Sequence, residues 1–105
     1  MSGGSDLDRL IACAASPIHG TGCFARVPIE AGEFIGTFTG PRVRTDGPHV
    51  LWADQGDGRW IARRGTSLLR YLNHSDNPNA AFHGFDLYAA NAIRPGEEIT
   101  IDYQP

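Results

Sequence analysis

The chain has 105 residues, which is enough for one domain and too short for a second one that folds independently. Apolar residues make up 41% and charged residues 20%, as in ordinary soluble domains, and no apolar run approaches the roughly 20 residues that span a bilayer. The formal net charge of −3 argues against a nucleic-acid-binding domain and suits a basic peptide as partner, although solubility alone explains such a charge in many proteins. Because the N-terminus lacks the pattern of a secretory signal, we expect a cytoplasmic protein.

Short runs rich in β-branched, aromatic and Leu residues recur between Gly, Pro, Asn and Asp clusters, and this rhythm predicts small β-sheets. Residues 1–6 hold a Gly/Ser stretch without an apolar anchor, so we expect 1–6 to be disordered and 7–105 to form one domain. The predicted strands are residues 10–14, 23–27, 34–39, 50–53, 59–62, 80–83, 87–90 and 99–103. One short helix is predicted over residues 66–72, where three Leu residues are spaced three and four apart.

Glycine-containing turns separate several of these strands. Residues 55–58 (Gln-Gly-Asp-Gly) predict a tight hairpin turn, which places Trp52 and Trp60 on paired strands. Residues 30–33 and 94–97 each place a Gly where a type II turn requires a positive φ. Both turns lie in an internal echo, Ile-x-x-Gly-Glu-x-Ile, at residues 29–35 and 93–99.

Three segments carry residues suited to chemistry. Residues 18–25 (Ile-His-Gly-Thr-Gly-Cys-Phe-Ala) hold two glycines that allow close approach of the backbone, and residues 70–79 (Arg-Tyr-Leu-Asn-His-Ser-Asp-Asn-Pro-Asn) are dense in polar side chains between apolar runs. Such a polar segment is either a hydrogen-bonded loop or a ligand site. Residues 96–103 end in Tyr103, whose side chain is either part of the hydrophobic core or part of a functional site.

The two cysteines, Cys13 and Cys23, have the spacing of neither a zinc site nor a disulfide framework, and we expect both to be free thiols. A zinc site that combines them with His19 and His74 is conceivable but lacks any recognised ligand spacing. We therefore expect no metal.

Together, and in this order, the three segments resemble the motifs of the SET domain family. Residues 18–25 match its first glycine motif, residues 70–79 are similar to its Arg-Phe-x-Asn-His-Ser-Cys-x-Pro-Asn motif, and residues 96–103 to its closing Gly-Glu-Glu-Leu-x-x-Asp-Tyr motif. The resemblance covers about residues 10–103. It implies a mostly β, β-clip-like fold of several small curved sheets with one short helix. It also implies a C-terminal pseudoknot, in which the last segment is threaded near the Asn-His-Ser motif and Tyr103 is buried.

The resemblance further implies an S-adenosylmethionine-dependent protein-lysine N-methyltransferase. The residues that it implies for cofactor binding are His19, Gly20, Thr21, Gly22, Arg70, Asn73 and His74. Tyr103 matches the family's active-site tyrosine and is the implied catalytic residue, with its hydroxyl directed at the methyl group and the amine. The implied partner is a protein or peptide with a lysine side chain; we expect neither a nucleic acid nor a membrane.

This sequence departs from the family pattern at several positions. Phe38 and Phe82 stand where channel tyrosines can occur, so we expect a more apolar and roomier lysine channel that permits more than one methylation. Asp76 replaces the usual Cys of the Asn-His-Ser-Cys motif, in keeping with the missing zinc site. No post-SET segment follows Tyr103 in these residues, so we expect the substrate or a partner subunit to close the site, and a homodimer is one such arrangement.

Two other interpretations remain open at this stage. A non-catalytic SET-like module would bind a protein or S-adenosylmethionine without turnover. A small all-β scaffold would use the Asn-His-Ser loop for structure alone.

Overall fold

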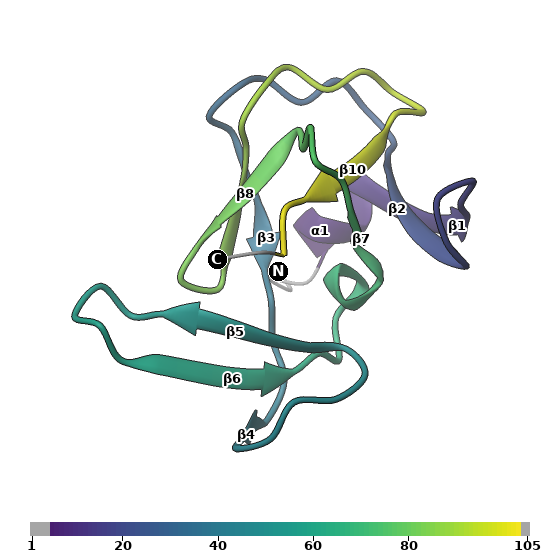
Figure 1. The fold of residues 1–105 in the computed structure, drawn as a ribbon. Coiled ribbons are helices and arrows are strands. Elements are labelled where there is room, and N and C mark those ends of the chain that lie inside the picture. Colours follow the sequence, from purple (N-terminus) through teal and green to yellow (C-terminus); the bar gives the residue numbers. More distant parts are fainter. Residues whose placement is uncertain (1–4, 104–105) are drawn as a thin grey trace.

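Three small β-sheets make up the fold of this computed structural model, which describes residues 5–103 (Figure 1). The first sheet has the order β1-β2-β10-β7, formed by β1 (Ile11–Ala15), β2 (Thr21–Ala25), β10 (Glu98–Ile101) and β7 (Asn73–His74). The second has the order β3-β9-β8, formed by β3 (Phe34–Thr37), β9 (Asp86–Ala89) and β8 (Ala80–His83). The third has the order β4-β6-β5, formed by β4 (Arg42–Val43), β6 (Trp60–Arg64) and β5 (Val50–Asp54). The prediction of a mostly β chain with several small sheets is confirmed.

Two short helical segments accompany the sheets. The helix predicted over residues 66–72 is a 3₁₀ turn, η1 (Leu68–Tyr71). An α-helix of six residues, α1 (Ser5–Leu10), was not predicted, because six residues are too few to show a periodicity. Residues 1–4 of the expected disordered N-terminus lie outside the described residues, and positions 5 and 6 belong to α1. Neither segment is long enough to cross a membrane, and no other helix occurs between residues 5 and 103.

The predicted hairpin between β5 and β6 is confirmed. Its strands pair in an antiparallel register that sets Trp52 opposite Ala62 and Trp60 opposite Asp54. Gly56 and Gly58 have φ values of 95° and 84°, which other residues adopt only with strain. The two tryptophans therefore lie on paired strands, two register positions apart and so on the same face.

The internal echo has a structural counterpart. Ile29 and Ile93 form an antiparallel bridge in which each backbone N–H donates to the other's carbonyl, at 2.9 and 2.8 Å. Both turns contain a glycine of positive φ, Gly32 and Gly96. The two repeats of the sequence motif thus pair with each other and enter neighbouring sheets from one junction.

Strand β10 lies inside the first sheet rather than at its edge. It pairs antiparallel with β2 and parallel with β7, so the C-terminal segment runs between elements from the beginning and the middle of the chain. Just after β7, the Ser75 N–H donates to Ile101 O at 3.0 Å. The Asn79 side chain donates to Glu98 O and accepts from Thr100 N, both at 2.9 Å. Residues 73–79 therefore hold β10 from several directions, as expected of the threaded C-terminal segment.

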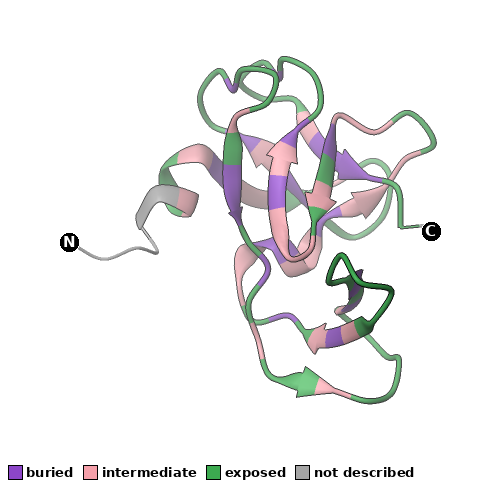
Figure 2. Cartoon of the chain, turned by 90° about the vertical axis from the view of Figure 1, so that its left-hand side faces the viewer, coloured by how far each residue is buried: buried purple, intermediate pink, exposed green. Residues whose placement is uncertain are grey.

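One hydrophobic core joins the first two sheets. Figure 2 shows buried residues gathered in this part of the molecule, whereas the β4-β6-β5 sheet is mainly exposed or intermediate. Gly36 in β3 leaves room for Leu7 of α1, whose Cδ1 lies 2.9 Å from where a Cβ would be. The most completely buried large aliphatic residues are Ile11, Ile29, Ile35, Leu69, Leu87, Ile93, Ile99 and Ile101.

Candidate functional site

The Asn73 side chain has a fixed orientation in the structure. Its Nδ2 donates to His19 O at 3.1 Å and to Glu98 Oε2 at 2.9 Å. Both partners only accept hydrogen bonds, so the amide nitrogen must face them. The amide oxygen is thereby left to serve as an acceptor on the other side, and Asn73 lines a pocket of about 410 Å³.

Glu98 supports this orientation from behind the pocket. The Ser16 hydroxyl donates to its carboxylate at 2.8 Å, and Asn73 binds the same group. Gly22 is buried beside it, and a Cβ at Gly22 would overlap Glu98 Oε2 and lie 3.1 Å from Asn73 Nδ2. The second glycine of the residue 18–25 motif therefore makes room for a carboxylate, and it does not line the pocket itself.

The first glycine of that motif shapes the connection between β1 and β2. Gly20 has a φ of 44°, and the Ser16 N–H donates to its carbonyl at 2.7 Å. No atom lies within 4 Å of the place where its Cβ would be. This turn brings His19, Gly20 and Thr21 to the pocket, all three of which line it.

Arg70 lines the same pocket from η1, but part of its guanidinium is already engaged. Nη1 donates to Thr66 O at 2.9 Å and to Ser67 O at 2.8 Å, and Nη2 donates to the Tyr71 hydroxyl at 2.8 Å. The guanidinium carbon also lies 4.3 Å from the centre of the Tyr71 ring. These contacts fix a positive charge at the wall of the pocket.

The imidazole of His74 contacts Tyr103 and does not line the pocket. The Tyr103 N–H donates to His74 Nδ1 at 3.1 Å, so Nδ1 must be the unprotonated nitrogen. Nε2 then carries the hydrogen and donates to Asp76 Oδ1 at 3.0 Å. Asp76, which stands where the family motif has Cys, thereby sets the tautomer that allows His74 to hold the Tyr103 backbone.

Tyr103 is not buried as expected, since 43% of its surface is exposed. Its hydroxyl is partly buried and donates to Leu72 O at 2.8 Å. Burial of this hydroxyl, followed by the nearby Cys23, raises the pKa of Tyr103 to about 12. The phenol is therefore neutral at physiological pH, and its oxygen keeps lone pairs for another donor.

The exposure of Tyr103 has a geometric reason: it lines two hollows at once. One is the 410 Å³ pocket with Asn73; the other is a groove of about 780 Å³ between the β5–β6 hairpin and β8. Val50 and Leu51 also line both hollows. The two spaces thus adjoin at these three residues.

The two predicted channel residues meet at this junction. Phe38 lines the pocket and Phe82 lines the groove. Their ring centres are 6.1 Å apart in an edge-to-face arrangement. Phe38 is almost fully buried, so the wall between the hollows is apolar apart from the Tyr103 hydroxyl.

One pocket is lined by seven of the predicted site residues: His19, Gly20, Thr21, Phe38, Arg70, Asn73 and Tyr103. The other three lie next to it: Gly22 beside Glu98, His74 against the Tyr103 backbone, and Phe82 in the groove. Glu98 and His49 are among the residues of the site that were not predicted. Glu98 lies in a recognised motif, but a Glu at the start of a strand is usually exposed. His49 lines the pocket with a φ of 60°, and its Nδ1 lies 3.1 Å from Arg70 O. The left-handed backbone of a non-glycine residue gives no signal in sequence.

The cysteines face each other across β1 and β2. Cys13 and Cys23 are register partners, and both are free. Both thiols point at Leu68 O, at 3.8 and 3.2 Å, and burial raises the pKa of the Cys23 thiol. No group of three His, Cys, Asp or Glu side chains suited to a metal ion occurs within residues 5–103.

The chain is similar to histone-lysine N-methyltransferases over most of its length. It is 29% identical to trithorax of Drosophila virilis over 85% of this chain, 27% to MEDEA of Arabidopsis thaliana over 91%, and 30% to Set2 of Drosophila melanogaster over 81%. It spans only 3%, 17% and 5% of those proteins.

The fold also matches solved structures. The methyltransferase domain of human PR domain-containing protein 2 has a TM-score of 0.74 at 18% identity, covering 92% of this chain and 78% of that one. The methyltransferase domain of human histone-lysine N-methyltransferase SETMAR has a TM-score of 0.76 at 20% identity, covering 89% of this chain and 44% of that one. The family model of the SET domain matches residues 20–104, and this chain therefore belongs to the SET domain family.

Proposed function

We propose that this domain is an S-adenosylmethionine-dependent protein-lysine N-methyltransferase. The observation that carries the proposal is the position of Tyr103, which lines both the pocket and the groove. In a reaction between a small cofactor and a long protein side chain, the two reactants must enter from separate openings and meet at one point. The pocket would take the cofactor, and the groove would take the peptide with its lysine directed past Phe82.

The residues around the pocket fit the amino-acid part of S-adenosylmethionine. The amide oxygen of Asn73 faces away from the acceptors that bind its Nδ2, so it can accept from the cofactor's ammonium group. Arg70 and the imidazoles of His19 and His49 line the same pocket, whereas no Asp or Glu does, which suits the carboxylate. A volume of about 410 Å³ lies in the range of small-molecule sites.

The bound cofactor supplies a methyl group on a sulfonium, and the chain supplies position and environment. A lysine amine, with a pKa of about 10.4 in water, must be neutral to attack. The apolar walls formed by Phe38 and Phe82 disfavour the charged amine and so lower its pKa. The Tyr103 oxygen, whose hydrogen is directed at Leu72 O, can accept an N–H of this amine and orient its lone pair. Alignment of this kind contributes at most about 7–11 kcal/mol.

The degree of methylation follows from the same apolar channel walls. Phe38 and Phe82 lack hydroxyl groups, so we assign only the Tyr103 hydroxyl as a hydrogen-bond partner of the lysine amine. Without further hydroxyl groups in the channel, an amine that already carries a methyl group still fits there. We therefore propose that the domain adds more than one methyl group. Mass spectrometry of reacted peptides that finds only the monomethylated product would count against this.

A peptide substrate is supported by the strands that border the groove. Residues of β5 and β8 line it from two sheets, and each is an edge strand in its sheet (Figure 1). Edge strands present unpaired backbone groups that an extended peptide can bond. Since the curated relatives are named histone-lysine methyltransferases, basic histone peptides are the first substrates to try.

The test is transfer of labelled methyl from S-adenosylmethionine to such peptides. All nine basic residues of the 105-residue chain are arginines, so lysine self-methylation cannot contribute to the signal. Tyr103→Phe should reduce kcat by about 10²-fold or more, the typical loss when one positioned polar group of an active site is removed. Binding of S-adenosylhomocysteine, followed by calorimetry, should change little.

The outcomes separate the alternatives. Methyl transfer at equal rates by the wild type and by Tyr103→Phe would remove Tyr103 from the mechanism. Binding of S-adenosylhomocysteine without any transfer would favour a non-catalytic module, and no binding would favour a scaffold. The homodimer and the cytoplasmic location stay predictions, to be tested by sedimentation and by imaging of the tagged protein.

A further inference from the structure

The groove between the β5–β6 hairpin and β8 is acidic. Three carboxylates line it, those of Asp46, Asp54 and Asp102, and no Arg, Lys or His is among the residues that line it. The junction with the pocket lies at one end of β5, at Val50 and Leu51. Asp54 lies at the other end of that strand, three to four residues away.

Two exposed tryptophans flank Asp54. Trp60 is its direct cross-strand partner, and Trp52 lies two residues earlier on the same strand. Side chains two apart on a strand, and those directly opposite, share one face of a sheet. Trp52 is 40% and Trp60 52% exposed, which is unusual for so large an aromatic side chain, and both line the groove.

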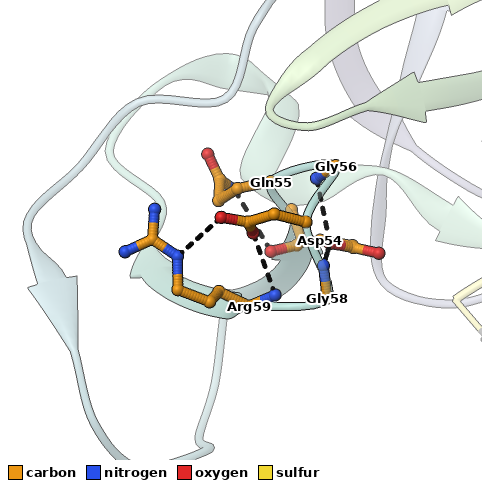
Figure 3. Close-up of polar contacts among 7 residues, drawn as sticks. Asp54, Gln55, Gly56, Gly58 and Arg59 are labelled. Carbon is orange, nitrogen blue, oxygen red and sulfur yellow. Dashed lines mark hydrogen bonds and ion pairs between the residues drawn. The ribbon is translucent and has the colours of Figure 1, made fainter.

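The carboxylate of Asp54 is held rigidly by the turn. Its Oδ1 accepts the backbone N–H groups of Gly56 at 3.0 Å and Gly58 at 3.1 Å, as the dashed lines of Figure 3 show. The arginine of the turn, Arg59, is paired with Asp57 at 2.8 Å. The turn therefore pairs its arginine with a different acid, and the carboxylate of Asp54 stays in place between two indoles.

We infer that Trp52, Asp54 and Trp60 form a subsite for a second basic side chain of the substrate peptide. An arginine is the best fit, because its guanidinium can pair with a carboxylate and stack on an indole at once. The inference rests on the proposed function, since the acceptor lysine defines the register. An extended peptide beside β5 advances at about the same 3.3 Å per residue as the strand. The arginine thus lies three or four residues from the acceptor lysine.

Peptides with one lysine and a single arginine, moved through every position from five before to five after it, test the spacing. At the position that places the arginine beside Asp54, arginine should give a kcat/KM about tenfold higher than glutamine at the same position. Asp54→Asn keeps the Oδ1 acceptor for the turn and should abolish this preference. Asp57→Asn removes the same charge from the same hairpin, outside the groove, and should keep it.

A binding experiment separates failure of this inference from failure of the proposed function. Fluorescein-labelled peptides with norleucine in place of the lysine are titrated by anisotropy, without any need for turnover, and Trp60→Leu removes the stacking partner. A preference for arginine that Asp54→Asn and Trp60→Leu weaken supports the subsite even if no methyl is transferred. Equal affinity at all arginine positions, or equal effects of Asp54→Asn and Asp57→Asn, would overturn it whatever the activity.

Discussion

Replacement of Glu98 by Ala would remove the group that orients Asn73. Its carboxylate accepts from the Ser16 hydroxyl at 2.8 Å and from Asn73 Nδ2 at 2.9 Å. A hydrogen bond to a charged group contributes about 1.5–3 kcal/mol, and the lower value applies because both bonds are only partly buried. Loss of both should lower the free energy of unfolding by about 3 kcal/mol, which corresponds to a fall in Tm of about 12 °C or more.

The same change should weaken cofactor binding. Without Glu98, Asn73 Nδ2 retains only the backbone carbonyls of His19 and Thr21 as partners. The amide oxygen is then no longer fixed toward the pocket. We expect the affinity for S-adenosylhomocysteine to fall about tenfold, the equivalent of about 1.4 kcal/mol. Glu98→Gln keeps one carbonyl for Asn73 and can donate to Ser16, so its loss should be roughly half as large in free energy.

Calorimetric titration and urea unfolding measure the two effects separately. Glu97→Ala is the matched control, because Glu97 Oε1 accepts only the Arg94 N–H of the adjoining turn. If Glu98→Ala bound S-adenosylhomocysteine as tightly as Glu97→Ala did, the assignment of Glu98 as a positioning residue would be refuted.

Further outcomes are expected at other positions. Gly22→Ala should lower the free energy of unfolding by about 1–3 kcal/mol through overpacking and weaken S-adenosylhomocysteine binding, because its Cβ would displace Glu98 and Asn73. Gly20→Ala, whose Cβ would meet no protein atom, should lower the free energy of unfolding only by the backbone strain of about 1 kcal/mol. Equal losses of stability in urea unfolding would contradict this difference. Phe82→Tyr should shift the product toward monomethyl-lysine, because a hydroxyl at the channel wall would hold the amine, and an unchanged product distribution by mass spectrometry would oppose this. Iodoacetamide should label half-buried Cys13 in the folded protein and Cys23 only after unfolding, since burial raises the pKa of the Cys23 thiol; equal rates in peptide mass spectra would contradict that order.

Much of the fold could be predicted because its turns carry a chemical signature. Gly32, Gly56, Gly58 and Gly96 all have the positive φ that their turn positions demand, and the strands between the turns follow. The two-residue strands β4 and β7 are too short for any periodic pattern. Their pairing depends on partners far away in the sequence, as when Asn73 pairs with Thr100.

The sequence predicted seven residues that line the 410 Å³ pocket but not the contacts that these residues make. The motifs brought Asn73 and Tyr103 together, yet the partners of His74 depend on Asp76 and on the register of β10, which no local pattern encodes. Glu98 was missed for a related reason. Residues 99–101 of strand β10 are buried on both faces, so burial does not alternate along the strand and the partial burial of Glu98 at its start has no signal in the sequence.

Strand β10 also connects the two hollows along the chain. It begins with Glu98, which orients Asn73 at the wall of the 410 Å³ pocket, and the chain reaches Tyr103 five residues later at the junction with the groove. In a fully extended chain these two positions would be about 17 Å apart. Because β10 is hydrogen-bonded to β2 on one side and to β7 on the other, Glu98 and the start of the segment that leads to Tyr103 share one register in the sheet. A substitution that shifted this register would displace both.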